Sequence, residues 1–394
     1  MTPLSPLIIR GRTLLPIVQG GMGVGVSAHR LAGSVAREGA MGTISSIDLR
    51  HHHPDLLEMC KHNPVQATLE AANQTALQRE IVAAKAISEG RGMVAVNVMR
   101  AVASYAASVQ TACENGADAI VMGAGLPLDL PDLTQGVDIA LIPILSDSRG
   151  IALVLKKWMK KNRLPDAIVI EHPGHAGGHL GVVSVADIPS ERFDFARVIE
   201  ETMLTFDTLG ISRTQIPLIV AGGIDAHAAV RRWLAAGASG VQLGTAFAVT
   251  QECDAHPEFK RILADATPED IVEFVSVTGL PARAVKTPWL ERYLRNEQRI
   301  RDKIGSRAQK CPTGLNCLAA CGLRDGIEKF GHFCIDTRLA AALRGDRATG
   351  LFFRGREALP FGSAIRSVRE LLDLLVADIR PADGGLNGAG AAGC

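Results

Sequence analysis

Residues 216–245 read IPLIVAGGIDAHAAVRRWLAAGASGVQLGT, and this stretch decides the fold. A short apolar run ends in Gly222-Gly223, a helical segment follows, and a second run ends in Gly244-Thr245. Neither run alternates between polar and apolar residues, which predicts strands buried on both faces, as in a parallel sheet. The stretch therefore predicts two consecutive strand–helix units.

The same unit recurs along the first 260 residues. Eight runs are expected to be strands: residues 15–19, 41–45, 93–98, 119–122, 140–145, 167–170, 216–220 and 240–243. Helical segments lie between them, among them residues 27–38, 75–89, 102–115, 149–161 and 226–236. Several end in Gly-Ala, where glycine takes the left-handed conformation that stops a helix. Eight such units in about 250 residues predict a (β/α)8 TIM barrel, and an open doubly wound sheet is the structural alternative.

The pattern changes after residue 260, where no further strand is expected. Residues 257–264, 290–304 and 336–344 look helical, as do residues 365–379. We therefore expect a barrel over residues 1–260, closed by a helix near residues 363–380, and a helical, cysteine-containing cap over residues 261–350. The Gly/Ala-rich residues 382–394 are expected to form a flexible tail.

Charge and composition exclude several classes of partner. The chain has 42 basic and 41 acidic residues, so no overall attraction to nucleic acid or anionic lipid is expected. No apolar run is long enough to span a membrane, and the N-terminus lacks the pattern of a secretory signal. We expect a cytoplasmic protein whose cysteines are thiols unless a metal binds them.

Residues that follow the strands of a TIM barrel form its active site. At these positions stand Gln19, Gly20, Gly21 and Met22; Asn97; Glu171, His172, Gly177, Gly178 and His179; Gly222 and Gly223; and Gln242, Leu243, Gly244 and Thr245. Gly-Gly after the seventh strand and Gly-Thr after the eighth predict a phosphate pocket, because glycines let backbone N–H groups approach an anion. The alternative is that these glycines only turn the chain. No Lys or Arg lies in the two loops, which favours a tightly held cofactor over a diffusing substrate.

Three histidines follow the sixth strand: His172, His175 and His179. The last is flanked by glycines, and imidazole titrates near neutral pH, so His179 is the candidate acid or base. A metal site built from the three histidines is the alternative, although no carboxylate or Cys at a matching spacing completes it. The run His51-His52-His53 is expected to be a solvated loop, with a role at the rim of the barrel as the alternative.

Five motifs together resemble the nitronate monooxygenase (2-nitropropane dioxygenase-like) family, whose motifs the flavin-dependent enoyl-ACP reductases share. They are PIVQGGM (residues 16–22), Asn97, AGGH (176–179), AGGI (221–224) and QLGT (242–245). The resemblance spans residues 8 to 290 and includes ECDAHP (252–257) and GLPAR (279–283).

The resemblance implies an FMN-binding barrel that oxidises alkyl nitronates with O2. By this resemblance Gly20, Gly21 and Met22 lie along the flavin ring, Asn97 bonds the ring, and the loops at Gly177-Gly178, Gly222-Gly223 and Gln242–Thr245 hold the phosphate. The catalytic residue would be His179. The implied partners are a small anionic nitronate and O2, and a homodimer is compatible with this assignment.

The sequence departs from the family at the sixth strand. The residue four before the catalytic His is often Glu in the family, and here it is His175. The loop is also one residue longer, so either Glu171 or His172 takes the flavin-contacting position. These extra imidazoles leave the substrate open.

Four cysteines cluster at Cys311, Cys317, Cys321 and Cys334, in a segment that resembles the C-terminal part of longer members. Clustered thiols suggest an iron–sulfur or zinc site, with buried structural thiols as the alternative.

Two further functions stay open beside nitronate oxidation. One is an NAD(P)H-dependent flavin reductase that acts on an enoyl thioester or a quinone, although no GxGxxG motif opens a helix after a strand. The other is a flavin-binding sensor without turnover.

Overall fold

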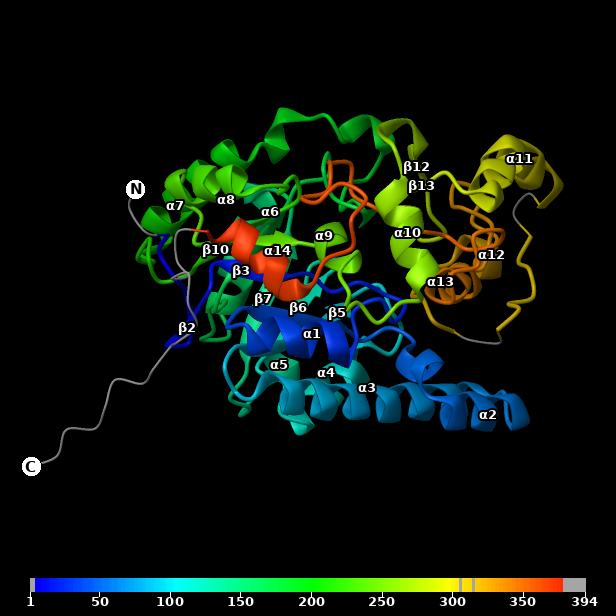
Figure 1. Ribbon diagram of the computed structural model, residues 1–394, viewed down its shortest axis with the longest axis horizontal. Coiled ribbons are helices and arrows are strands. Elements are labelled where there is room, and N and C mark those ends of the chain that lie inside the picture. Colours follow the sequence, from blue (N-terminus) through cyan, green and yellow to red (C-terminus); the bar gives the residue numbers. More distant parts are fainter. Residues whose placement is uncertain (1–3, 305–306, 314–315, 378–394) are drawn as a thin grey trace, which may run out of the picture.

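Eight parallel strands close into a barrel, which confirms the (β/α)8 fold and excludes the open sheet (Figure 1). The computed structural model describes residues 4–304, 307–313 and 316–377. In chain order the barrel strands are β3 (Ile17–Gln19), β4 (Met41–Ser45), β5 (Met93–Met99), β6 (Ala119–Gly123), β7 (Ala140–Leu145), β8 (Ile168–Glu171), β10 (Leu218–Ala221) and β11 (Gly240–Leu243). Each strand pairs with the next, and β11 pairs with β3 to close the ring.

Both faces of the barrel strands are buried, as their apolar runs predicted. On β5, Met93 and Ala95 belong to the apolar cluster inside the barrel, whereas Val94 and Val96 belong to the cluster between the strands and the helices. Asn97 continues the inner series because side chains alternate along a strand, and it therefore points toward the barrel axis at the mouth. The hairpin of β1 (Leu7–Ile9) and β2 (Arg12–Leu14) adds apolar side chains to the inner cluster and closes the opposite end.

Helices surround the barrel. In this part of the chain they are α1 (His29–Arg37), α2 (Pro54–His62), α3 (Gln66–Ser88), α4 (Tyr105–Glu114), α5 (Leu130–Leu133), α6 (Ser148–Met159), α7 (Phe195–Leu209), α8 (His227–Ala235) and α9 (Thr245–Ala248), with the 3-10 helices η1 (Leu49–His52), η2 (Val185–Asp187) and η3 (Glu191–Phe193). The last unit has only the four-residue α9. Helix α14 (Val368–Leu375) lies within the residues expected for a closing helix, and it contacts α1, α8 and α9. It thus occupies the place of an eighth outer helix.

The expectation that no strand follows residue 260 is wrong. Strands β12 (Ile271–Val275) and β13 (Pro281–Val285) pair antiparallel, and β13 also pairs with β9 (Gly178–His179) from the loop after β8. Residues 281–285 read PARAV, which has few β-branched residues, and their partner β9 is only two residues long, so neither gives a local strand signal. Region 261–350 is therefore not purely helical.

The remaining elements are α10 (Pro257–Asp265), η4 (Pro268–Asp270), α11 (Pro288–Ile304), α12 (Gly322–Asp325) and α13 (Ile335–Leu343). With β12 and β13 they lie beyond one end of the barrel, at the right of Figure 1. In the described residues no helix is both long and apolar enough to cross a membrane. The tail expected over residues 382–394 lies outside the described residues.

Candidate active site

A cavity of about 970 Å³ lies at the carboxyl ends of the barrel strands. Its wall brings together most of the residues expected at the site: Gly20, Gly21, Met22, Asn97, Glu171, Gly177, Gly178, His179, Gly222, Gly223, Gln242, Leu243, Gly244 and Thr245. These residues come from five of the eight strand ends. Gln19 and His172 do not line the cavity.

Gln19 is part of the barrel wall. Its side chain is fully buried, its Oε1 accepts a hydrogen bond from the backbone N–H of Thr43 at 2.8 Å, and its Nε2 donates to the Thr43 carbonyl at 3.1 Å. The ladder between β3 and β4 has a single residue pair, Val18 with Met41. The Gln19 amide therefore replaces backbone bonds between these two strands, and the structure does not place it against a ligand.

His172 is a structural residue as well. Its Nδ1 accepts a hydrogen bond from the backbone N–H of Gly174 at 2.9 Å, and its ring packs edge-on against Phe195 with 5.2 Å between centroids. Burial, with His175 as a smaller cause, lowers the pKa of His172 to about 4. Of the two candidates for the flavin-contacting position, Glu171 is the one that faces the cavity.

Gly222 and Gly223 form a cradle that a side chain would fill. Their φ values are +104° and +74°, which side chains rarely tolerate. A Cβ on either residue would lie 3.1 Å from the side chain of His175. In the described part of the chain, neither backbone N–H group has a hydrogen-bond acceptor. Two N–H donors without partners in a cavity wall favour an anion there.

A segment that sequence reasoning missed packs against this cradle. We call residues 353–359 the strap. The backbone N–H of Gly355 donates to Thr245 Oγ1 at 2.9 Å, that of Arg356 donates to the His175 carbonyl at 3.2 Å, and Glu357 Oε1 lies 2.5 Å from His175 Nδ1. A Cβ on Gly177 would lie 2.5 Å from the backbone of Arg354, so only glycine permits this approach. The sequence FRGREAL carries no motif that could have identified the strap.

At the end of the first strand, β3, Gly20 and Gly21 form a part of the cavity wall from which no side chain projects. A Cβ on Gly21 would overlap Asn97, and one on Gly20 would lie 3.2 Å from the Gln242 amide. The Nδ2 of Asn97 donates to the Val121 carbonyl at 3.3 Å, whereas Gln242 Oε1 is buried without a partner among the described residues. A buried acceptor of this kind calls for a donor on a ligand or a water.

His179 reaches the cavity from β9. Strand β9 pairs with β13, His179 Nε2 lies 2.9 Å from Ser276 Oγ, and the ring packs against Phe353 with 5.7 Å between centroids. Although the ring borders the cavity, protein surrounds it closely, and this burial lowers the pKa of His179 to about 4. The imidazole is therefore neutral near pH 7, when it can accept a proton or donate a hydrogen bond.

Glu171 provides a second titratable group in the cavity wall. Burial raises the pKa of its carboxyl to about 7. Near neutral pH this carboxyl is therefore divided between its acid and carboxylate forms, unlike an exposed Glu.

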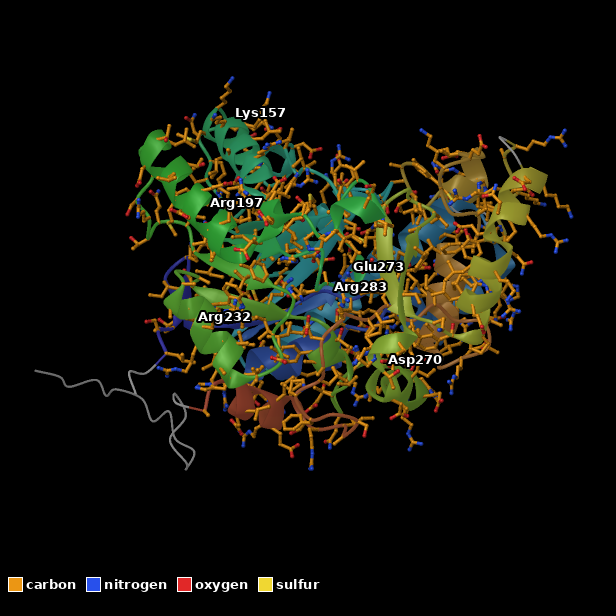
Figure 2. The ribbon with its side chains drawn as sticks, turned by 90° about the horizontal axis from the view of Figure 1, so that it is seen from above. Lys157, Arg197, Arg232, Asp270, Glu273 and Arg283 are labelled. Atoms are coloured by element: carbon orange, nitrogen blue, oxygen red, sulfur yellow. The ribbon has the colours of Figure 1, made fainter. Side chains whose placement is uncertain are left out.

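Arg283 holds the loop that carries His179. Its side chain is 1% exposed, and its guanidinium donates to the Ala176 carbonyl and lies 2.6 Å from Glu273 Oε1. Figure 2 shows Arg283 beside Glu273 on the paired strands β12 and β13. The sheet thus fixes the loop through a charged hydrogen bond as well as through β9.

The four clustered cysteines are not arranged as metal ligands in the part of the chain that the structure describes. Cys311, Cys317, Cys321 and Cys334 form no disulfide bond, and no three of these sulfurs gather as metal ligands would among the described residues. Burial raises the pKa of Cys317 to about 12, so its sulfur is protonated when no metal is bound. The structure supports neither an iron–sulfur nor a zinc site here, nor one at His172, His175 and His179.

Known proteins resemble the chain over most of its length. The family model for nitronate monooxygenase matches residues 7–378. A probable nitronate monooxygenase of Bacillus subtilis (strain 168) is 27% identical over 296 residues, which cover 72% of this chain and 79% of that protein.

Solved structures share the fold. A nitroalkane oxidase from Streptomyces ansochromogenes superimposes with a TM-score of 0.63 at 19% identity, covering 92% of this chain and 95% of the other. FabK from Thermotoga maritima gives a TM-score of 0.62 at 20% identity, covering 92% of each chain. The family match over nearly the whole chain, with the barrel and its cavity, shows that the protein is an oxidoreductase that belongs to the nitronate monooxygenase family.

Proposed function

We propose that the protein binds FMN in this cavity and oxidises small alkyl nitronates with O2. The observation that carries the proposal is one shared cavity wall: it holds both the unpartnered amides of Gly222 and Gly223 and the neutral imidazole of His179. The first suits the phosphate of a flavin nucleotide, and the second suits acid–base chemistry beside its ring.

The residues present fit FMN at three places. The Gly222-Gly223 cradle has free N–H donors and no room for a side chain, as a phosphate site requires. The unpartnered Gln242 Oε1 would accept a hydrogen bond from a ring N–H. Gly20 and Gly21 leave the first strand end free of side chains, so a flat ring could lie there.

His175 would add a side-chain donor to the phosphate site. Its ring lies against Gly223 and its Cβ against Gly222, and its Nδ1 is bound to Glu357 on the strap. With Nδ1 held by a carboxylate, the other ring nitrogen is left for a ligand. The residue that departs from the family pattern would thus take a binding role in this chain.

The bound flavin would supply the redox chemistry, by taking two electrons from the nitronate and delivering them to oxygen. Neutral His179 would accept the carbon-bound proton of a nitroalkane, or donate a hydrogen bond to the oxygens of a nitronate. Ser276 would fix the tautomer and orientation of the ring through its 2.9 Å contact with Nε2. Glu171, in its acid form, would donate a hydrogen bond where negative charge accumulates.

Oxygen consumption tests the proposal. Purified protein reconstituted with FMN and supplied with ethylnitronate should consume O2, and the flavin released by heating should be FMN. Absence of nitronate-dependent O2 uptake by a fully loaded protein would contradict the proposed activity, although not the binding of FMN.

The size of the cavity favours a second candidate function. At about 970 Å³ it is at the upper end for small-ligand sites, and its wall extends to Gln66, Glu70 and Asn73 on α3. This extension would suit a larger second ligand, such as NAD(P)H or an enoyl thioester. Rapid anaerobic bleaching of the flavin by NADH or NADPH would favour such a reductase.

A further inference from the structure

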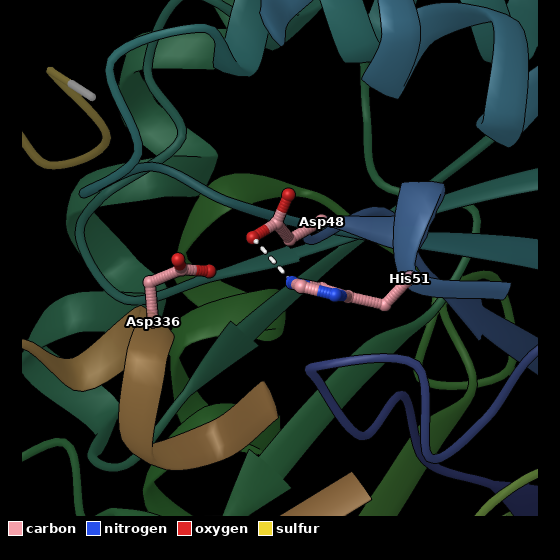
Figure 3. Close-up of side chains that lie close together, drawn as sticks. All are labelled: Asp48, His51 and Asp336. Carbon is pink, nitrogen blue, oxygen red and sulfur yellow. Dashed lines mark ion pairs between the residues drawn. The ribbon is translucent and has the colours of Figure 1, made fainter. Parts of the chain in front are cut away.

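Asp48, His51 and Asp336 form a cluster that includes none of the residues expected to hold the flavin. Asp48 follows β4, His51 belongs to η1, and Asp336 is the second residue of α13, so the cluster joins the barrel to the C-terminal region. One ligand atom from each residue lies within 4.8 Å of the other two (Figure 3).

The histidine run is therefore not the solvated loop expected from the sequence. The His51 side chain is 12% exposed, His52 Nε2 lies 2.7 Å from the Gly25 carbonyl, and His53 Nε2 lies 2.9 Å from Glu80 Oε1. Of the three, His51 is the one turned toward two carboxylates.

The separation of His51 and Asp48 is compatible with two ligands of one ion. His51 Nε2 lies 3.3 Å from Asp48 Oδ2, yet both atoms are buried and neither has a hydrogen-bond partner among the described residues. Two ligands at about 2.1 Å from a tetrahedral ion would lie about 3.4 Å apart. The observed separation matches that value.

The negative charge of the cluster is only partly compensated, which favours the binding of a cation. Asp48 and Asp336 are 6% and 7% exposed, and Arg50 is the only cationic side chain ion-paired with either carboxylate in the described residues apart from His51. Arg50 contacts Asp48 through Oδ1 and leaves Oδ2 directed at His51.

We propose that Asp48, His51 and Asp336 bind a divalent transition-metal ion. One imidazole and two carboxylates suit Zn²⁺ or Mn²⁺ better than Mg²⁺ or Ca²⁺, which prefer oxygen ligands alone. Asp48 and Asp336 also line the large cavity, so an open coordination position would face it and could take an anionic oxygen of a ligand. The proposal does not depend on the flavin or on nitronate oxidation.

Metal titration of the purified flavin-loaded protein tests it. After treatment with a chelator, the protein should bind one equivalent of Mn²⁺. The loss of the EPR signal of the free ion measures this binding. Mn²⁺ is the probe because thiols bind it poorly, which keeps the clustered cysteines out of the measurement. His51→Gln and Asp336→Asn should each weaken binding at least about tenfold.

His62→Gln is the matched control. His62 is 79% exposed on α2 and pairs with Glu58, so its loss should leave Mn²⁺ affinity unchanged. Calorimetric titration with Zn²⁺ repeats the test for a softer ion, with Cys317→Ser as the control for thiol binding. If Asp336→Asn does not fold, as judged by its flavin spectrum, His51→Gln decides. Failure to bind either ion, or equal binding by wild type and both cluster variants, would overturn the proposal.

Discussion

His179 is held in place by residues nearly one hundred positions away. Its contact with Ser276 spans 97 residues, and burial keeps the ring neutral. A neutral, oriented imidazole contributes about 10²–10⁴-fold to a proton-transfer step.

We expect His179→Ala to keep its yellow colour and lose about 10²-fold or more of its activity on nitronates. The substitution removes the acid–base group but no part of the phosphate cradle. Steady-state O2 uptake and the visible spectrum measure the two properties, and His62→Ala serves as the exposed-histidine control. Normal turnover by His179→Ala would show that the catalytic assignment is wrong.

Gly223→Asp should have the opposite effect and expel FMN. A carboxylate at φ +74° would crowd His175 and repel the phosphate. Gly210→Asp is the control for backbone strain, because Gly210 has a similar φ of +69° with nothing within 4 Å of its Cβ position. Fluorescence titration with FMN should show weak or no binding by Gly223→Asp and normal binding by Gly210→Asp. Equal FMN affinity in the two variants would show that this loop does not bind the phosphate.

Glu171 should give the protein a pH dependence near 7. Its folded pKa of about 7 lies above the ordinary 4.5, so the carboxyl stabilises the fold least when ionised, and stability is lost as pH rises from about 4.5 through 7. Glu171→Gln has no such loss. The melting temperature of the variant minus that of wild type should therefore increase between pH 5 and 8.

His172 and His179 contribute to the pH dependence of stability with the opposite sign. This contribution is the same in wild type and in Glu171→Gln, so it cancels in the difference between their melting temperatures. The lowered pKa values of the two histidines make both proteins lose stability as pH falls from 6.5 toward 4. A difference in melting temperature that stays constant with pH would show that the Glu171 pKa is not raised.

At the scale of elements, the barrel could be predicted and the sheet beside it could not. The eight strand runs carry their own signal, since a strand buried on both faces is apolar at every position. Strand β9 is two residues long and β13 contains Pro281 and Arg283, so their pairing is set by partners about a hundred residues apart. Glycines at strand ends revealed the cradle, whereas the strap has no such pattern.

Arg283 connects this sheet to the catalytic loop, and its loss should destabilise both. Arg283→Met leaves the Ala176 carbonyl and Glu273 without their charged donor, which should lower the free energy of unfolding by about 2–4 kcal/mol. It should also reduce activity more than FMN affinity, because β9 carries His179. Arg213→Met, which breaks an exposed pair with Asp207, should cost less than about 1 kcal/mol. Urea unfolding followed by circular dichroism measures both, and equal losses would contradict the role given to Arg283.

At the scale of the whole molecule, the site is assembled from distant segments. The pair His175–Glu357 spans 182 residues, and the cavity wall draws on the barrel, on α3 and on the C-terminal region. Most of the residues that line the cavity at strand ends could be predicted, because the barrel fixes where strand ends meet. Gln19 and His172 could not be separated from them, because a buried structural polar residue and a ligand-binding one look alike in sequence.

The central claim is that one cavity holds both FMN and the nitronate. Anaerobic mixing of the yellow protein with ethylnitronate in a stopped-flow spectrophotometer tests it most directly. We predict rapid loss of the flavin absorbance, abolished in His179→Ala, and recovery of the absorbance when O2 is admitted. Flavin that stays oxidised with excess ethylnitronate would contradict the claim, as would folded protein that remains colourless after incubation with FMN.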